Sequence, residues 1–192
     1  MARSKRDALP QVEIHRLDAL VAWLDAHHAQ STSVWLVTYK KHHASYIAWG
    51  DVVDELLCWG WVDSQVRALD ADRMMHLIAP RRAGSAWSRV NKQKIARLTE
   101  ANRMRPSGVA TIERAQADGS WTFLDDVEDL IVPDDLAAAL AQHDGAAAQF
   151  ESFPRSSKRA TLEWIKTAKR PETRAKRIAE TASGAAEGQR VR

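Results

Sequence analysis

The chain has 192 residues, a formal net charge of +3 and one cysteine, Cys58. A chain of this length can bury one substantial core, and a single thiol excludes both an intramolecular disulfide and a zinc site built from several thiolates. No run of about 18 apolar residues is present, and none follows the basic residues within positions 1–10, so we expect a cytoplasmic protein without signal peptide or transmembrane segment.

The first part of the chain predicts both helices and strands. Apolar residues at helical spacing predict a helix over residues 16–29, and a second helix over 50–59 should end at Gly60, because glycine tolerates the left-handed conformation of a C-terminal cap. Runs rich in β-branched and aromatic residues predict strands, the first of them buried on both faces. These strands cover residues 34–41, 62–68 and 73–79.

The rest of the chain predicts helices joined by loops. Capping residues and prolines indicate helix starts near Ser88, Pro106, Pro133, Ser157 and Pro171. Residues 121–129 are predicted to form an acidic loop with apolar anchors, and residues 183–192 a flexible tail. The fold class is therefore α+β, with a small, mainly antiparallel sheet packed by helices and an all-helical C-terminal half.

The charges are arranged in blocks. Residues 81–105 contain eight Lys/Arg against one acid, residues 106–150 one Arg against nine acids, and residues 151–192 eleven Lys/Arg against five acids. Two interpretations remain open. The blocks can pair with one another within the fold, or the basic segments can form a face for phosphate-bearing ligands.

One candidate constellation lies where a predicted helix ends and a strand begins. Its sequence is Cys58-Trp59-Gly60-Trp61-Val62-Asp63. A carboxylate this close to a core needs hydrogen-bond donors or solvent, so Asp63 is either a general base or ligand-orienting acceptor, or a partner for a backbone amide or Arg81. Cys58 is expected to pack as a small apolar residue rather than act as a nucleophile.

A second constellation is a basic, glycine-containing loop between a strand and a helix, over residues 80–92. Arg81 and Arg82 could bind an anion together with free amides at the helix start, although no P-loop motif is present. Trp87 could stack on a ligand or anchor the helix. Asn91 could orient a ligand or hold the loop backbone, and Ser88 lies between them. The predicted ligand-binding residues are Lys40, Asp63, Arg81, Arg82, Trp87, Ser88 and Asn91.

Other polar groups carry weaker hypotheses. Lys40 follows the first strand, and its charge is expected at the same end of the sheet as the 80–91 loop. Ser88, His76 and Asp63 could form a triad, but no nucleophile-elbow motif supports it. Adjacent histidines are poor metal ligands, so the sequence predicts neither a metal site nor a cofactor. The cations of residues 166–177 are expected on an exposed helical face, with nucleic-acid or membrane-surface attraction as the alternative.

These motifs together resemble the YdeI/OmpD-associated, or bacteriocin-protection, family. The elements are Tyr39-Lys40-Lys41, the 58–63 motif, Pro80-Arg81-Arg82 with Ser85 to Asn91, Met104 with Gly108, Gly119 with Trp121, and Lys169-Arg170-Pro171-Glu172-Thr173-Arg174. The resemblance covers nearly the whole chain, roughly residues 34–178. The resemblance implies protection against bacteriocins and cationic peptides and association with an outer-membrane porin, without a defined reaction or active site.

Taken together, these patterns predict one domain over residues 1–182, with a sheet-containing part at 34–80 and a helical part at 87–182. The leading hypothesis is a stress-protection protein that binds an anionic or aromatic small ligand near the 80–91 loop. One alternative is an enzyme that uses Asp63 as acid or base in the same pocket. Another is a nucleic-acid-binding protein that uses residues 81–105 and 155–177.

Overall fold

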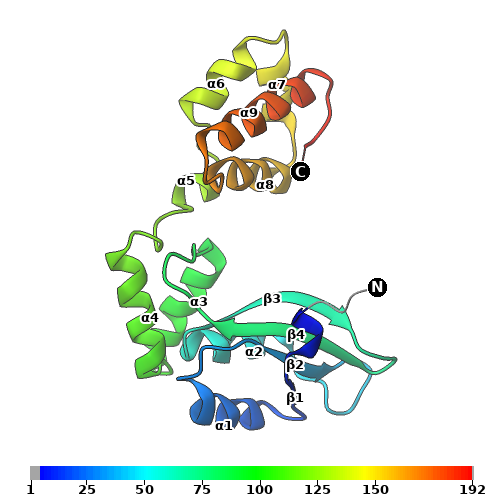
Figure 1. The fold of residues 1–192 in the computed structure, drawn as a ribbon, viewed down its shortest axis with the longest axis vertical. Helices are drawn as coiled ribbons and strands as arrows, with labels where there is room; N and C mark the ends of the chain where they lie inside the picture. Colours follow the sequence, from blue (N-terminus) through cyan, green and yellow to red (C-terminus); the bar gives the residue numbers. More distant parts are fainter. Residues whose placement is uncertain (1–4, 192) are drawn as a thin grey trace. The chain divides into compact units, whose positions relative to one another are not determined.

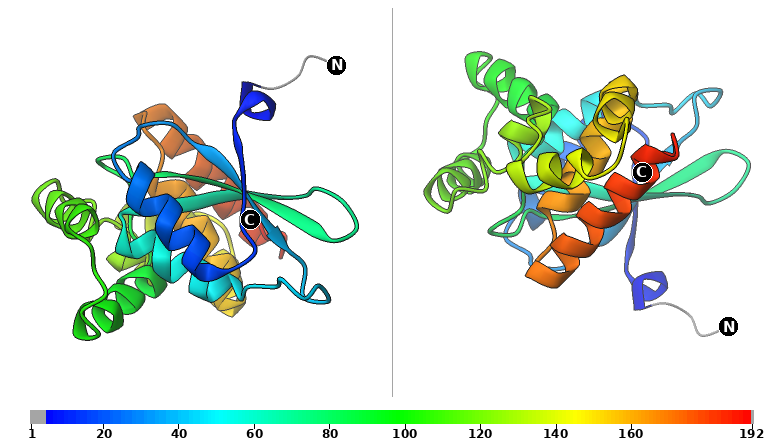
Figure 2. Two further views of the ribbon diagram at one scale, coloured as in Figure 1. Left: turned by 90° about the horizontal axis from the view of Figure 1, so that it is seen from below. Right: turned by 90° about the horizontal axis from the view of Figure 1, so that it is seen from above.

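The structure is a computed structural model that describes residues 5–191 (Figures 1 and 2). Residues 1–4 of the predicted domain and Arg192 of the predicted tail lie outside the described residues. The chain forms two compact units, the first ending at Thr122 and the second beginning at Phe123. The helices α3 (Arg89–Glu100) and α4 (Pro106–Ala117), expected in the helical part of one domain, belong to the first unit with the sheet.

The first unit contains a four-stranded mixed sheet. Its order is β1 (Gln11–Glu13), β2 (Val34–Tyr39), β4 (Arg73–Pro80) and β3 (Trp61–Ala68). Strand β1 runs parallel to β2, and the other two pairings are antiparallel, which confirms a small, mainly antiparallel sheet. The predicted burial of β2 on both faces is also confirmed, because its first five residues are buried.

Helices α1 (Leu17–His27) and α2 (Trp49–Cys58) pack on the sheet through apolar stripes. Leu24 of α1 and Leu56 of α2 belong to the same core cluster as Leu36 of β2 and Ile78 of β4. A short 3-10 helix, η1 (Lys5–Ala8), precedes β1. As predicted, Gly60 follows α2 with a φ of 77°, and the chain turns there directly into β3.

Helix α4 approaches the end of α2 closely at Gly108. A Cβ atom at this position would lie 2.1 Å from the carbonyl oxygen of Cys58, so only glycine fits. Arg105 donates its backbone N–H to the same oxygen at 3.0 Å, and the Ser107 hydroxyl donates to the Trp59 carbonyl at 3.0 Å. These contacts attach α4 to the junction between α2 and β3.

The second unit is helical. It contains α5 (Asp125–Glu128), α6 (Asp134–Ala141), α7 (Ala146–Ser152), α8 (Arg155–Lys166) and α9 (Pro171–Ala186). Its interior includes Leu136, Phe150, Leu162, Ile165 and Ala182, all buried. Among the described residues, no helix of the chain is long and apolar enough to cross a membrane.

Two helix ends and one loop differ from the sequence predictions. Helix α8 begins at Arg155 after Pro154, so Ser157 lies inside the first turn and is not the cap. Helix α9 continues to Ala186, four residues into the predicted tail, because Ala185 is fully buried. The predicted acidic loop contains the one-turn helix α5.

Candidate functional site

The 80–91 loop holds Arg81 and Trp87 against each other. Arg81 is 7% exposed, and its Cζ atom lies 3.6 Å from the centroid of the Trp87 ring, which is itself buried. Its Nη1 donates to the Ala86 carbonyl at 3.0 Å, while its Nε has no hydrogen-bond partner among the described residues. Burial lowers the pKa of Arg81 to about 10, an effect that the charge of Asp63 partly offsets. The cation and the ring predicted to contact a ligand thus contact one another.

The same loop also has an internal anion. The carboxylate of Asp118 accepts the backbone N–H of Gly84 at 2.9 Å and that of Ser120 at 2.9 Å. The Ser120 side-chain and backbone hydrogen bonds, together with the Gly84 amide, hold the pKa of Asp118 below its ordinary value. The crevice lined by Arg81, Arg82, Arg114 and Asp118 is closed to water in this conformation. Arg82 is the exposed arginine of the pair predicted to bind charge.

Ser88 and Asn91 serve the start of α3. The Ser88 hydroxyl caps the helix and accepts the Asn91 backbone N–H at 3.3 Å. Asn91 is half-buried, one turn from Trp87. A role for either side chain in ligand binding stays a prediction.

Asp63 lies on β3, half-buried and opposite Ile78 of β4. Its charge acts on Arg81 and on His76, whose pKa burial lowers below the ordinary value. The His76 ring stacks on Trp49, with centroids 3.6 Å apart, and the Ser88 hydroxyl is used as a cap, so these residues have structural partners outside the hypothetical triad. Acid–base chemistry at Asp63 stays a prediction.

Lys40 does not share an end of the sheet with the 80–91 loop, so that expectation is wrong. Antiparallel pairing places Tyr39 opposite Arg73 and Val34 opposite Ile78, so the end of β2 meets the start of β4. The Lys40 ammonium donates to the carbonyls of Asp70 and Ala71 at 2.6 and 2.9 Å, at the β3–β4 hairpin.

Cys58 packs as predicted. It is fully buried, and burial raises the pKa of its thiol to about 11. A thiol with this pKa stays protonated near neutral pH and is a poor nucleophile.

Part of each charge block is paired inside the fold. Lys94 and Arg97 of α3 bind the buried carboxylate of Asp54, and Arg103 binds Glu55, both on α2. In the second unit, acids of the 106–150 block bind cations of the last block, in the pairs Asp126–Lys166, Glu128–Arg159 and Asp135–Arg174. Contact between the acidic block and the C-terminal basic block therefore forms, whereas the 81–105 block finds much of its partner charge on α2.

An open groove lies beside the loop, between α3 and α4, and encloses about 340 Å³. Ile95, Met104, Val109, Ile112 and Trp121 supply its apolar surface. The Lys92 ammonium lies 5.6 Å from the centroid of the Trp121 ring, and Glu113 and Gln116 line the groove from α4. Trp121 is half-buried and contacts Trp87, with ring centroids 5.2 Å apart.

Trp121 and Lys92 line the groove but are not among the ligand-binding residues predicted from the sequence. Trp121 looked like an apolar anchor of an acidic loop, and Lys92 like one cation of a basic block. The available sequence signal was the alignment of Val109 and Ile112 with Gln116 on one face of α4, and Val109 is 40% exposed in the structure.

Comparison with known families divides the chain in the same way as its structure. Residues 12–111, just over half of the chain, match the family described as a domain of unknown function (DUF8412). The chain belongs to the DUF8412 family. Residues 129–188 match the family described as bacteriocin-protection, YdeI or OmpD-associated. No curated protein and no solved structure gives a significant match.

The YdeI/OmpD-associated match confirms the resemblance within the second unit. Of the motifs that suggested it, residues 169–174 lie inside this match, whereas those at residues 39–108 lie inside the DUF8412 match. Within the described residues, no three His, Cys, Asp or Glu side chains are placed to hold one metal ion.

Proposed function

We propose that this protein acts by binding an aromatic anion in the α3–α4 groove, in a protective role of the kind that the bacteriocin-protection description names. The observation that carries the proposal is the Trp121 ring in an open groove with the Lys92 ammonium over it. An indole face stacks on planar rings, and an ammonium favours an anionic substituent beside them. The volume of about 340 Å³ lies in the range of small-molecule sites.

The groove offers, beside the 80–91 loop, the same two kinds of group that were expected in the loop, a cation and an indole ring. Arg81 and Trp87 contact one another, whereas Lys92 and Trp121 line the open groove between α3 and α4. The buried pair also gives Trp121 a rigid backing, since the two indoles are in contact. A stacking surface held from behind loses little side-chain entropy when a ligand binds.

The test compares three ligands against the full chain by thermal shift and calorimetry. Indole-3-acetate supplies a ring and an anion, indole the ring alone, and cyclohexylacetate the anion alone. We expect indole-3-acetate to bind most tightly and to raise the unfolding temperature progressively as its concentration exceeds its Kd. Cyclohexylacetate binding as tightly as indole-3-acetate would contradict stacking on Trp121.

Two variants locate the site. Trp121→Leu keeps an apolar side chain but removes the ring face, and should weaken indole-3-acetate by about fivefold, or roughly 1 kcal/mol. Lys92→Met should weaken the binding of indole-3-acetate and leave the affinity for indole unchanged. Lys169→Met is the matched control, since Lys169 is an exposed lysine in the other unit. Equal losses in Lys92→Met and Lys169→Met would indicate net charge rather than a site.

The protective role is tested separately from binding. A bacterium sensitive to cationic peptides should survive better when it expresses the wild-type chain, and Trp121→Leu should reduce that benefit at equal protein level. If Trp121→Leu protected as well as the wild type, protection would not depend on binding in the groove.

A further inference from the structure

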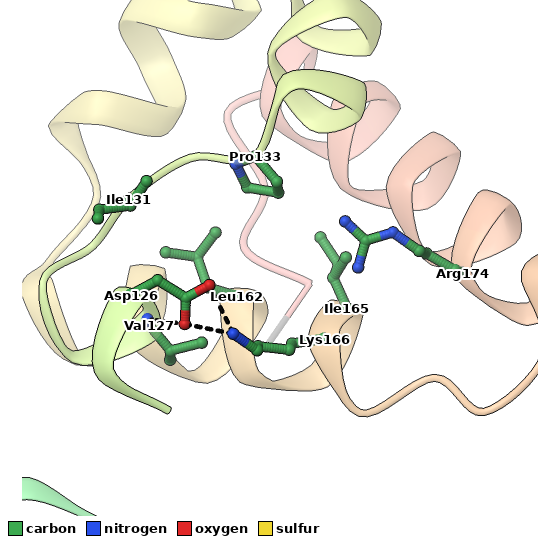
Figure 3. Close-up of a pocket in the computed structure, with 8 residues that line it drawn as sticks. All are labelled: Asp126, Val127, Ile131, Pro133, Leu162, Ile165, Lys166 and Arg174. Carbon is green, nitrogen blue, oxygen red and sulfur yellow. Dashed lines mark hydrogen bonds and ion pairs between the residues drawn. The ribbon is translucent and has the colours of Figure 1, made fainter. Parts of the chain in front are cut away.

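A second open pocket lies within the C-terminal unit, between α5, the segment leading to α6, and helices α8 and α9 (Figure 3). It encloses about 200 Å³. Its apolar side chains are Val127, Ile131, Pro133, Leu162 and Ile165, and its charged side chains are Asp126, Lys166 and Arg174. No part of the α3–α4 groove contributes to it, so a negative result at one site leaves the proposal for the other unaffected.

Arg174 presents an unused hydrogen-bonding edge to this pocket. Its Nε and Nη2 donate to the two carboxylate oxygens of Asp135 at 2.7 and 2.9 Å. A guanidinium carries five N–H donors in a plane, and this pair uses one edge of it. The guanidinium points into the pocket in Figure 3, and its Nη1 has no hydrogen-bond partner among the described residues. Asp135 thus fixes the group while leaving a second fork available.

The other charges of the pocket select against strongly charged ligands. The Lys166 ammonium binds both oxygens of Asp126 at 2.5 and 2.6 Å, which largely neutralises that carboxylate. Because Lys166 is engaged by Asp126, Arg174 is the lining cation that offers an open edge, and this edge matches one planar carboxylate better than a phosphate dianion, which would need a second cation. The apolar side chains opposite Arg174 favour a ligand with a branched hydrocarbon group. Ile131 at the mouth is 59% exposed and would gain cover from such a ligand.

We propose that this pocket binds a small carboxylic acid with a branched apolar group, its carboxylate on the free edge of Arg174 and its hydrocarbon against Ile131, Leu162 and Ile165. Two sources share this chemistry, a free monocarboxylic acid and an α-amino acid. An amino acid would place its ammonium beside Asp126, which has acceptor capacity beyond its bonds to Lys166 and the Val127 amide.

The experiment follows methyl signals of the full chain by NMR during titration with 4-methylpentanoate, L-leucine, neutral 4-methylpentanamide and inorganic phosphate. We expect saturable shifts at Ile131, Leu162 and Ile165, with a Kd on the order of 1 mM for a ligand of this size. Stronger binding of 4-methylpentanoate than of L-leucine identifies a free acid, and the reverse order identifies an amino acid. The amide or phosphate binding as tightly as both carboxylates would overturn the proposal.

A pair of variants tests the role of Arg174. Arg174→Lys keeps a cation beside Asp135 but has no second planar edge, and should weaken carboxylate binding at least fivefold. Arg170→Lys makes the same change at an exposed position outside the pocket and should bind like the wild type. Ile131→Ser is a second variant at an exposed position, where a substitution should leave folding intact. It should weaken ligand binding about threefold. Unchanged binding in both Arg174→Lys and Ile131→Ser would place the ligand elsewhere and refute the site.

Discussion

The buried guanidinium of Arg81 contributes to stability through Trp87 and the Ala86 carbonyl rather than through solvent or a ligand. Such a contact is strong because the cation is desolvated, and part of its gain is lost to the burial that lowers the pKa of Arg81. Arg82, the next residue, is exposed. The two arginines therefore form a natural comparison.

We expect Arg81→Ala to lower the free energy of unfolding by about 2 kcal/mol, because the cation–π contact and a charged hydrogen bond are lost together. Arg82→Ala should change it by less than about 0.5 kcal/mol. Urea denaturation of the full chain measures both. Similar changes in the free energy of unfolding for the two variants would mean that the contacts of Arg81 with Trp87 and the Ala86 carbonyl do not stabilise the fold.

Asp118 makes the 80–91 loop sensitive to acid. Its pKa is lowered in the folded state by Ser120 and the Gly84 amide, so it contributes stability above its unfolded value of 3.8 and loses it as pH falls through the lower, folded pKa. The Gly84 amide signal should therefore move with a midpoint below pH 3.8 in an NMR titration. In Asp118→Asn this transition should be absent; its persistence would assign it to another group.

At the scale of elements, the junction of α2, β3 and α4 depends on close backbone contact. Gly108→Ala places a methyl group 2.1 Å from the Cys58 carbonyl oxygen, and should cost about 1–3 kcal/mol as α4 is displaced. Gly50→Ala is the matched control, since nothing lies within 4 Å of a Cβ atom there, and it should stabilise α2 by about 0.5 kcal/mol. Thermal unfolding should show a lower unfolding temperature for Gly108→Ala and a higher one for Gly50→Ala than for the wild type.

Elements with a complete apolar stripe or a buried run could be predicted from the sequence, and short elements could not. Helix α2 and strand β2 carry their periodicity over ten and six residues. Strand β1 has three residues with one apolar side chain, Val12, and exists because β2 offers it an edge. Helix α7 depends in the same way on its packing against α9.

The residue types near the 80–91 loop could be read from the sequence, but the contacts that these residues make could not. Charge and aromaticity are visible in a sequence, whereas the direction of a side chain depends on the tertiary fold. Arg81 and Trp87 turned toward each other, and Trp121, more than thirty residues away along the chain, supplies the accessible ring. Lys40 was misplaced because antiparallel register, which sequence periodicity does not determine, sets which strand ends meet.

At the scale of the whole molecule, two units carry two different family matches. Each has its own interior, the first built on the sheet with Leu36 and Ile78, the second on helices with Leu136 and Phe150. The boundary at Thr122 and Phe123 follows Trp121, the last residue that lines the groove.

We expect residues 123–192 expressed alone to retain helical circular dichroism and a cooperative thermal transition. Residues 1–122 expressed alone should also unfold cooperatively, with a circular dichroism spectrum that combines helix and strand signals. Amide spectra of each fragment should overlay on those of the full chain away from the cut. A second fragment without cooperative unfolding would show that its core is incomplete on its own.

The position of a bound aromatic anion on the first unit decides whether the α3–α4 groove is the binding site. Methyl NMR of the full chain, titrated with indole-3-acetate, reports on Met104 and Ile112 in the α3–α4 groove and on Ala83 and Ala86 in the 80–91 loop. If the anion binds in the groove, saturable shifts should appear at Met104 and Ile112 and should weaken in Trp121→Leu. Shifts confined to Ala83 and Ala86 would contradict binding in the groove and would place the anion at the 80–91 loop.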